Sequence, residues 1–278
     1  MSFFYFKKRP PSVIHQISLS GLGGVQQSFV DYYRLAREKS SLHHMVFGNF
    51  DLDQRFGPVE DYYNLHRSTF SKIRFLAALC SSRHIVHFYN NLGSRAIRRL
   101  LRFIPDPLCL FHERGMAWNI PTAQGQAVRD NAAKAKIILA NSKATKVLLV
   151  KKFGISDENI KVLYNGIQFV KPPEEKPPTL REHALSVGYI GRLDTPKGVP
   201  SLIEAARLLS ACKAKISFRI AGSGPIEEML RRQAKEIKNL FFLGAVSNPY
   251  VFLSCVDVVV VPSIREPFGN VIVEAGLM

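Results

Sequence analysis

The sequence has few cysteines, and they lie too far apart to define a disulfide or zinc framework. The four are Cys80, Cys109, Cys212 and Cys255, and no two form a Cys-x-x-Cys pair. Buried free thiols in a reducing compartment are the simplest interpretation. The sequence also lacks a histidine cluster, so it implies no metal and no cofactor.

Long hydrophobic runs and export signals are missing as well. No apolar run reaches the roughly 18 residues that a membrane span requires. Residues 1–10 carry their charges after their apolar residues and lack the cationic start and cleavage site of a signal peptide. We therefore expect a cytoplasmic protein.

Acidic residues are scarce: 22 Asp and Glu stand against 38 Lys and Arg, a net charge of +16. This favours an anionic partner, but zinc-finger, RNP-type and homeodomain-like patterns are absent, so we do not expect nucleic acid. The predicted helix 94–103 carries four arginines on one face by three-and-four spacing, namely Arg95, Arg98, Arg99 and Arg102. Such a helix can lie on an anionic membrane, although an ordinary solvated face is the simpler alternative.

Strand and helix patterns alternate along the chain, which predicts an α/β protein with two doubly wound, Rossmann-like parallel-sheet domains. The predicted strands are 13–20, 45–49, 85–89, 108–112, 137–140, 160–163, 186–190, 216–221, 240–243 and the apolar run 257–263. The predicted helices are 25–38, 71–80, 94–103, 123–134, 143–153, 199–209, 226–237 and 249–255. A Pro-rich linker, 171–182, cannot continue a sheet and separates domain 1–170 from domain 183–278.

Two carboxylates near the end of the chain give the strongest local signal. The run 257–263 predicts a buried parallel strand, and a glycine-containing turn behind it opens a predicted helix. Glu266 lies in the turn and Glu274 in the helix. Loop acids at such a point can hold sugar hydroxyls, and the amides at the helix start suit an anion; they belong to Phe268, Gly269 and Asn270. The pattern fits a ligand that is both sugar and phosphate.

A loop upstream carries two cations in a similar setting. Residues 186–190 predict a strand, and the Gly/Pro loop that follows contains Arg192 and Lys197 before the predicted helix 199–209. Two cations in one loop can neutralise a pyrophosphate leaving group without a metal ion.

Together these motifs resemble a known family. Gly-Arg-x4-Lys-Gly followed by Glu-x7-Glu, with Phe-Gly inside the second motif, is similar to the retaining GT-B glycosyltransferases of family 4. The resemblance implies two Rossmann-like domains that face a cleft. It also implies transfer of a sugar, with retention, from a UDP- or GDP-linked donor to a glycan or lipid-linked acceptor in cell-surface polysaccharide or lipopolysaccharide synthesis.

The same resemblance implies roles for single residues in the second domain. Arg192 and Lys197 would hold the diphosphate and stabilise the charge that builds on it. Glu266 would hold hydroxyls of the donor sugar, and Glu274 would hold the ribose. Gly222 would shape the nucleotide side, and the amides of residues 268–270 would add neutral donors.

Two features of the first domain are further candidates. The loop of Gly23 and Gly24 is not a dinucleotide fingerprint, because Gln26 stands where its last glycine would be. In the resembling enzymes it lies against donor phosphates or acceptor, whereas a tight turn is the simpler alternative. His112 matches a family histidine that meets the donor sugar; a structural role, or a role for Glu113 or Arg114 instead, stays open.

The family's second domain continues beyond the second Glu of the motif, whereas this chain stops at Met278. We therefore expect an incomplete second domain and little transferase activity. Three alternatives stay open: an inactive fragment, a non-catalytic nucleotide-sugar-binding protein, and a GT-B sugar-nucleotide epimerase. A phosphorylase would need a lysine environment for a pyridoxal cofactor, and the sequence shows none.

Overall fold

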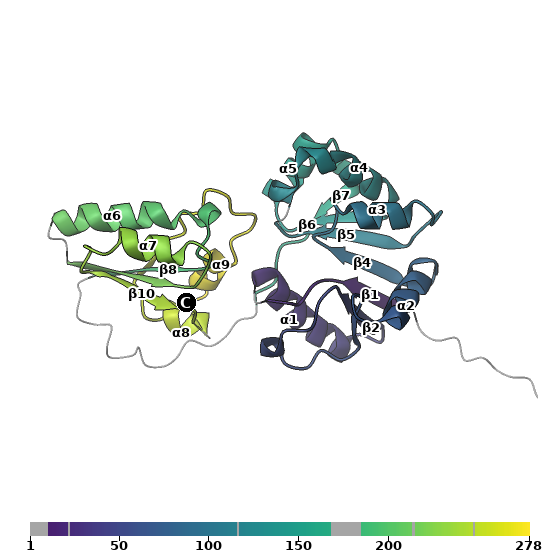
Figure 1. Ribbon diagram of the computed structural model, residues 1–278, viewed down its shortest axis with the longest axis horizontal. Helices are drawn as coiled ribbons and strands as arrows, with labels where there is room; N and C mark the ends of the chain where they lie inside the picture. The colour runs from purple at the N-terminus through teal and green to yellow at the C-terminus, as the bar shows by residue number, and fades with distance from the viewer. Residues whose placement is uncertain (1–10, 22, 116, 168–184, 213–214, 247) are drawn as a thin grey trace, which may run out of the picture. The chain divides into compact units, whose positions relative to one another are not determined.

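The computed structural model describes residues 11–21, 23–115, 117–167, 185–212, 215–246 and 248–278. The chain forms two compact units, unit 1 (Met1–Gly166) and unit 2 (Ile167–Met278) (Figure 1). The predicted linker 171–182 lies outside the described residues.

Unit 1 is built on a seven-stranded parallel sheet with the order β3-β2-β1-β4-β5-β6-β7. Its strands are β1 (Ser12–Gln16), β2 (His43–Gly48), β3 (Tyr62–Asn64), β4 (Ile85–Tyr89), β5 (Cys109–Glu113), β6 (Ile137–Ala140) and β7 (Ile160–Val162). β3 was not predicted from the sequence, because three residues are too few to show alternation. The chain builds outward from β1 to β3 and then returns to β4, so the strand order reverses between β1 and β4.

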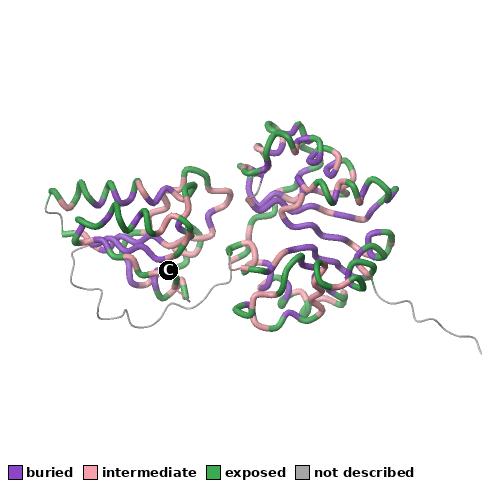
Figure 2. Tube along the Cα trace, viewed as in Figure 1, coloured by how far each residue is buried: buried purple, intermediate pink, exposed green. Residues whose placement is uncertain are grey.

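Five helices cover the two faces of this sheet: α1 (Gly24–Lys39), α2 (Thr69–Leu79), α3 (Arg95–Leu101), α4 (Gly125–Lys134) and α5 (Lys143–Phe153). α1 packs on one face, in a cluster with Val46 of β2. The other four pack on the opposite face, in a cluster with Met45 and Phe47, because successive strand side chains point to opposite faces. Figure 2 shows the buried strands between the partly exposed helices. Serine side chains cap α2, α3 and α5 at Ser68, Ser94 and Ser142.

Unit 2 contains a four-stranded parallel sheet with the order β10-β9-β8-β11. Its strands are β8 (Leu185–Ile190), β9 (Ile216–Ala221), β10 (Leu240–Gly244) and β11 (Val258–Val259), and its helices are α6 (Val199–Ala211), α7 (Glu227–Gln233), α8 (Pro249–Leu253) and α9 (Asn270–Gly276). Side chains of β8, β9, α6 and α7 share one core cluster, which includes Val187, Phe218, Ile203 and Leu230.

The prediction of a long, buried strand over 257–263 is wrong. Only Val258 and Val259 pair with β8, and Val258 is 43% exposed. β11 is the edge strand of the described sheet, so it has a neighbour on one side alone, and Pro262 has no N–H to extend a ladder. α7 likewise ends at Gln233, four residues before the predicted end.

The loop after β8 and the loop after β11 touch through their backbones. Gly198 has a φ of +68°, and a Cβ at this position would lie 2.0 Å from the Pro262 carbonyl oxygen. The Ile264 N–H donates to the Pro196 carbonyl at 2.9 Å. Glycine at 198 is therefore required both for the left-handed conformation and for the close approach.

We expect Gly198→Ala to be far more costly than Gly244→Ala. Gly244 has a similar φ, +71°, but open space around its Cβ position. The stability that Gly244→Ala loses therefore measures the left-handed backbone strain alone. That strain should lower the free energy of unfolding by about 1–2 kcal/mol. Gly198→Ala should lower it by about 3 kcal/mol, because the Pro262 loop must also move. Urea denaturation of both variants tests this, and equal losses would contradict it.

Candidate functional site

The candidate site of unit 2 lies at the carboxyl ends of β8 and β11. The chain builds outward from β8 to β10 and then returns to the other side of β8 as β11. The strand order therefore reverses between β8 and β11, which is where open parallel sheets bind ligands. The loops that leave these two strands carry Arg192, Lys197 and Glu266.

Lys197 and Glu266, both predicted from the sequence, form an ion pair. The Lys197 Nζ lies 2.6 Å from the Glu266 Oε2, and both side chains are partly buried. The Ser263 hydroxyl donates to the same oxygen at 3.0 Å. An ammonium group has three N–H donors, so Lys197 keeps two for a ligand. Glu266 makes no hydrogen bond through Oε1 to any residue that the structure describes. The pair can hold an anion and a hydroxyl side by side.

Arg192 lies in the same loop with a more open side chain. Its Nε is 3.5 Å from the Asp194 Oδ2, and the side chain is 70% exposed. The Tyr189 hydroxyl donates to the Arg192 carbonyl at 2.8 Å and so stabilises the loop. Burial raises the pKa of the Tyr189 phenol, which keeps this donor protonated. From the sequence, Arg192 and Lys197 are predicted as two cations of one loop. The structure gives each an acidic neighbour.

α9 supplies the remaining predicted groups of this loop. Gly269 precedes the helix with a φ of +82°, and a Cβ there would lie 2.8 Å from the Ile272 Cδ1. Phe268 and Asn270 flank this glycine. Glu274 lies in the second half of α9, and burial raises the pKa of its carboxyl group. The predicted residues of the second motif thus share one turn and one short helix.

Gly222 has a visible structural role at the end of β9. It has a φ of +140°, and a Cβ there would lie 1.8 Å from the Gly191 carbonyl oxygen. Its N–H donates to the Gly244 carbonyl at 2.7 Å. Gly222 lets the loops after β8 and β9 meet, and its contribution to the nucleotide side remains a prediction.

In unit 1, the predicted glycine loop lies at the point where the strand order reverses. Gly23 is extended and precedes α1, which begins at Gly24 without a side-chain cap. The Arg114 Nη1 lies 3.4 Å from the Val25 carbonyl, and the Asn165 Oδ1 accepts from the Arg114 Nε and Nη2 at 3.1 and 2.8 Å. A buried guanidinium is therefore held beside the glycine loop.

His112 lies in β5 as a buried, neutral imidazole. Neither ring nitrogen has a hydrogen-bond partner among the described residues. Burial lowers its pKa to about 3. The ring stacks on His87 with centroids 5.6 Å apart. His112 is therefore an unsatisfied donor and acceptor at the carboxyl edge of the sheet.

His112 belongs to a row of four histidines that was not predicted from the sequence. His15 and His44 are hydrogen-bonded between β1 and β2 at 2.9 Å, and His15 lies beside His87 of β4 in the strand register. The row crosses β2, β1, β4 and β5. The four residues are far apart in the sequence, so only the register of the sheet could have revealed it.

Glu113, one alternative to His112, has a structural contact. Its side chain is fully buried, and the Leu92 N–H donates to its Oε1 at 3.0 Å. Burial raises the pKa of Glu113 to about 7. Arg114, the other alternative, lies beside the glycine loop as described above.

Within residues 11–278, apart from the undescribed gaps, no group of three or more His, Cys, Asp or Glu side chains is arranged to hold a metal ion. None of the described helices is both long enough and apolar enough to span a bilayer.

Residues 184–278 match a family model described as Glycosyl transferases group 1. A Campylobacter jejuni N-acetylgalactosamine-N,N'-diacetylbacillosaminyl-diphospho-undecaprenol 4-alpha-N-acetylgalactosaminyltransferase is 33% identical over 51% of this chain and 39% of its own length. The Staphylococcus aureus capsular polysaccharide biosynthesis glycosyltransferase CapM is 30% identical over 51% of this chain and 38% of its own length. The matched part thus spans about two-fifths of these relatives.

Solved structures match nearly the whole chain. HepE from Anabaena, in complex with UDP and glucose, superposes with a TM-score of 0.75 at 20% identity, over 96% of this chain and 78% of HepE. The fold is GT-B. WaaB, a lipopolysaccharide outer core galactosyltransferase in its apo form, has a TM-score of 0.69 at 19% identity, over 95% of this chain and 77% of WaaB. In the GT-B fold both sheets are parallel and Rossmann-like, as predicted.

We expect Glu113→Gln to change how stability depends on pH. Because the folded-state pKa, about 7, lies above the ordinary 4.5, Glu113 favours folding below about pH 4.5 and loses this contribution as the pH rises through about 7. Between pH 4.5 and 8, the free energy of unfolding of the variant should rise relative to that of the wild type by up to about 3 kcal/mol. Denaturation across this range measures it.

The exposed Glu158→Gln is the matched control for removal of one carboxylate from unit 1. The buried histidines titrate in all three proteins, so their opposite pH dependence cancels in the comparison. A constant difference between Glu113→Gln and the wild type at every pH would show that Glu113 does not titrate in this range.

Proposed function

We propose that this protein is a glycosyltransferase that moves a sugar from a UDP- or GDP-linked donor to a glycan or lipid-linked acceptor, with retention of anomeric configuration. The observation that carries the proposal is the Lys197–Glu266 pair, 2.6 Å apart, at the strand-order reversal of unit 2. It joins a group that binds phosphate to a group that binds sugar hydroxyls, inside the region that matches the glycosyltransferase family model.

The chemistry follows from the contacts of this pair. Lys197 offers its two remaining N–H donors to the diphosphate, and the exposed Arg192 guanidinium adds a second cation. As the glycosidic bond breaks, negative charge grows on the diphosphate, and both cations stabilise that charge. Glu266, oriented by Ser263, accepts from hydroxyls of the donor sugar through Oε1.

Several predicted residues complete the donor site in this proposal. Glu274 of α9 holds the ribose, and Gly222 shapes the nucleotide side where the loops after β8 and β9 meet. The turn of Phe268, Gly269 and Asn270 supports the diphosphate.

Unit 1 contributes to the same reaction in this proposal. His112, a neutral imidazole whose ring nitrogens lack partners among the described residues, contacts the donor sugar. Gly23 and Gly24 line the approach of phosphate or acceptor, with the Arg114 guanidinium beside them. A neutral imidazole can either donate or accept a hydrogen bond, which suits a sugar hydroxyl.

The names of the relatives support the substrate classes. HepE was solved with UDP and glucose, the Campylobacter relative is named for a diphospho-undecaprenol-linked substrate, and the Staphylococcus relative is named for capsular polysaccharide biosynthesis. We infer a role in cell-surface polysaccharide or lipopolysaccharide synthesis. Transfer or hydrolysis of a nucleotide sugar separates this enzyme from a non-catalytic binding protein.

We also propose that the protein works in the cytoplasm and contacts the anionic membrane surface through α3. Arg95, Arg99 and Arg102 are exposed, and Phe103 beside them is exposed too. Arg98 differs, because it forms an ion pair with Asp130 of α4. Arg95 donates to the Ala123 carbonyl at 3.4 Å, so among the described residues three arginines of the predicted face lack an ion-pair partner and one has Asp130.

Arg192→Ala and Lys197→Ala should each weaken UDP or GDP binding by roughly tenfold or more, because a charge-assisted contact contributes about 1.5–3 kcal/mol. Arg232→Ala is the matched control for Arg192. The Arg232 side chain is 74% exposed and its Nη2 lies 3.6 Å from the Glu228 Oε1. Its exposure and its acidic neighbour therefore resemble those of Arg192, but Arg232 belongs to α7 and not to the loop. Titration calorimetry with free nucleoside diphosphates measures the effect. Unchanged affinity in both loop variants would refute the phosphate assignment.

The two acids should separate kinetically. Glu266→Gln should lower turnover more than nucleotide affinity, because its proposed contact is with the transferred sugar. Glu274→Gln should weaken the binding of the free nucleoside diphosphate, because the proposed contact of Glu274 is with the ribose. Thermal melts recorded beside the kinetics identify a purely structural role. Lower melting temperatures with normal kinetics for both variants would rule out both contacts.

A further inference from the structure

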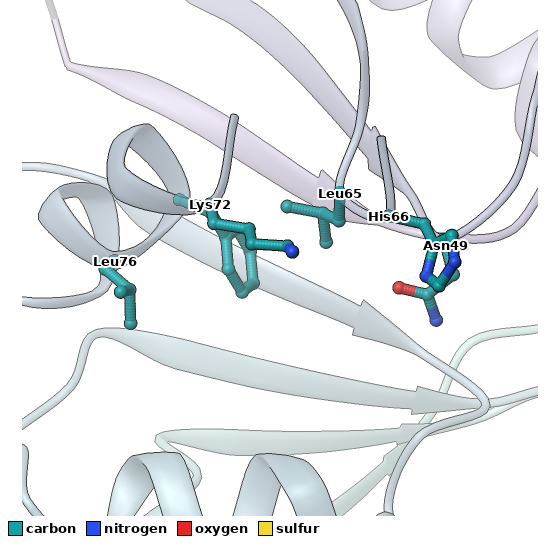
Figure 3. A pocket seen from close by; sticks show the side chains of 6 residues that line it. Asn49, Leu65, His66, Lys72 and Leu76 are labelled. Atoms are coloured by element: carbon teal, nitrogen blue, oxygen red, sulfur yellow. The ribbon is translucent and has the colours of Figure 1, made fainter. Parts of the chain in front are cut away.

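An open pocket in unit 1 lies under α2, away from the residues discussed so far. Its volume is about 390 Å³ and its walls come from α2 and from the segments that follow β2 and β3. Asn49, Leu65, His66, Lys72 and Leu76 line it together with Phe75 (Figure 3). Asn49 and Leu65 come directly after the carboxyl ends of their strands. The pocket is therefore on the same edge of the sheet as Gly23 and Gly24.

The pocket combines apolar walls with polar side chains. No described residue makes a hydrogen bond or ion pair with the side chains of Asn49, His66 or Lys72. Figure 3 shows Lys72 extending from α2 towards the side of the pocket where His66 and Asn49 lie. An ammonium, an imidazole and an amide can together offer several N–H donors to one anionic group.

A ridge of exposed apolar side chains runs along α2 beside this pocket. Phe70, Ile73 and Leu76 are spaced by three residues, so they share one side of the helix, and they are 68%, 60% and 42% exposed. We refer to these three residues as the α2 ridge. Leu76 belongs both to the ridge and to the pocket wall. A contiguous exposed apolar strip that leads into a pocket is typical of a binding surface for an apolar chain.

The charge around the pocket favours an anion. Residues 62–80, which supply five of the six lining residues, contain three Lys and Arg and no Asp or Glu. The nearest acid in the preceding loop, Asp51, accepts from Asn64 at 2.8 Å and pairs with Arg67 at 2.8 Å. Lys72 therefore has its charge available for a ligand.

We propose that this pocket binds the phosphate head of a lipid-linked acceptor, a polyprenyl diphosphate that carries the acceptor sugar. Lys72, His66 and Asn49 contact the diphosphate, and the hydrocarbon chain follows the α2 ridge. The inference rests on the proposed function, because it names the acceptor class of that reaction. Free phosphate would contact Lys72, but it would leave the apolar walls and the α2 ridge without a ligand.

Calorimetry of the full chain with farnesyl diphosphate, inorganic pyrophosphate and farnesol tests the site. Farnesyl diphosphate should bind more tightly than either of the others, because it alone engages both parts. Lys72→Gln should weaken it by roughly tenfold. The double variant Phe70→Ser/Ile73→Ser should weaken the binding of farnesyl diphosphate by a similar factor and leave the affinity for pyrophosphate unchanged. Exposed controls are Lys143→Gln on α5 for the charge and Leu208→Ser on α6 for the apolar loss.

Three results would overturn the proposal: no binding of farnesyl diphosphate, no effect of Lys72→Gln, or equal binding of pyrophosphate with no effect of the ridge variant. The last result would identify a free-phosphate site. Nucleoside diphosphate affinity, measured on the same variants, should stay unchanged. Arg192→Ala and Lys197→Ala could leave the nucleoside diphosphate affinity unchanged while Lys72→Gln weakens the binding of farnesyl diphosphate. That result would refute the donor site in unit 2 and support the pocket in unit 1.

Discussion

The contact between Gly198 and the Pro262 carbonyl determines the geometry of the candidate donor site. Only a residue without a Cβ allows the loop after β8 and the loop after β11 to touch here. The contact brings Lys197 within 2.6 Å of Glu266, although the two are 69 positions apart in the chain. A cation and a carboxylate from distant parts of the chain thus lie side by side, where we propose that phosphate and sugar bind together.

In both units the candidate residues lie at the carboxyl edge of a parallel sheet. In unit 2 the strand order reverses between β8 and β11, and the charged loops leave the sheet there. In unit 1 it reverses between β1 and β4, where the glycine loop lies, and the α2 pocket opens on the same edge beyond β2. The two units differ in chemistry: unit 2 presents ion-paired acids and bases, whereas unit 1 presents buried neutral histidines, one buried arginine and an apolar ridge.

Sequence patterns predicted the parts of the site that are local. Arg192 and Lys197 lie within one loop, and Glu266 and Glu274 lie within one turn and helix, so their neighbourhood needed no knowledge of the sheet. The β11 prediction failed, because a β-branched run has the same pattern whether it lies in the middle of a sheet or at its edge. Arg98 was assigned to an open cationic face because Asp130, its partner, belongs to another helix.

The sequence by itself determined the alternation of strands and helices, the positions of the glycines that permit left-handed turns, and the chemical types available in each loop. These depend on interactions between residues close together in the chain, which a linear pattern records. Only the tertiary structure decided which charges are paired, that four histidines form a row across β2, β1, β4 and β5, and that α2 leaves an apolar ridge beside a pocket. These depend on strand register and helix packing, which bring together residues from distant parts of the chain.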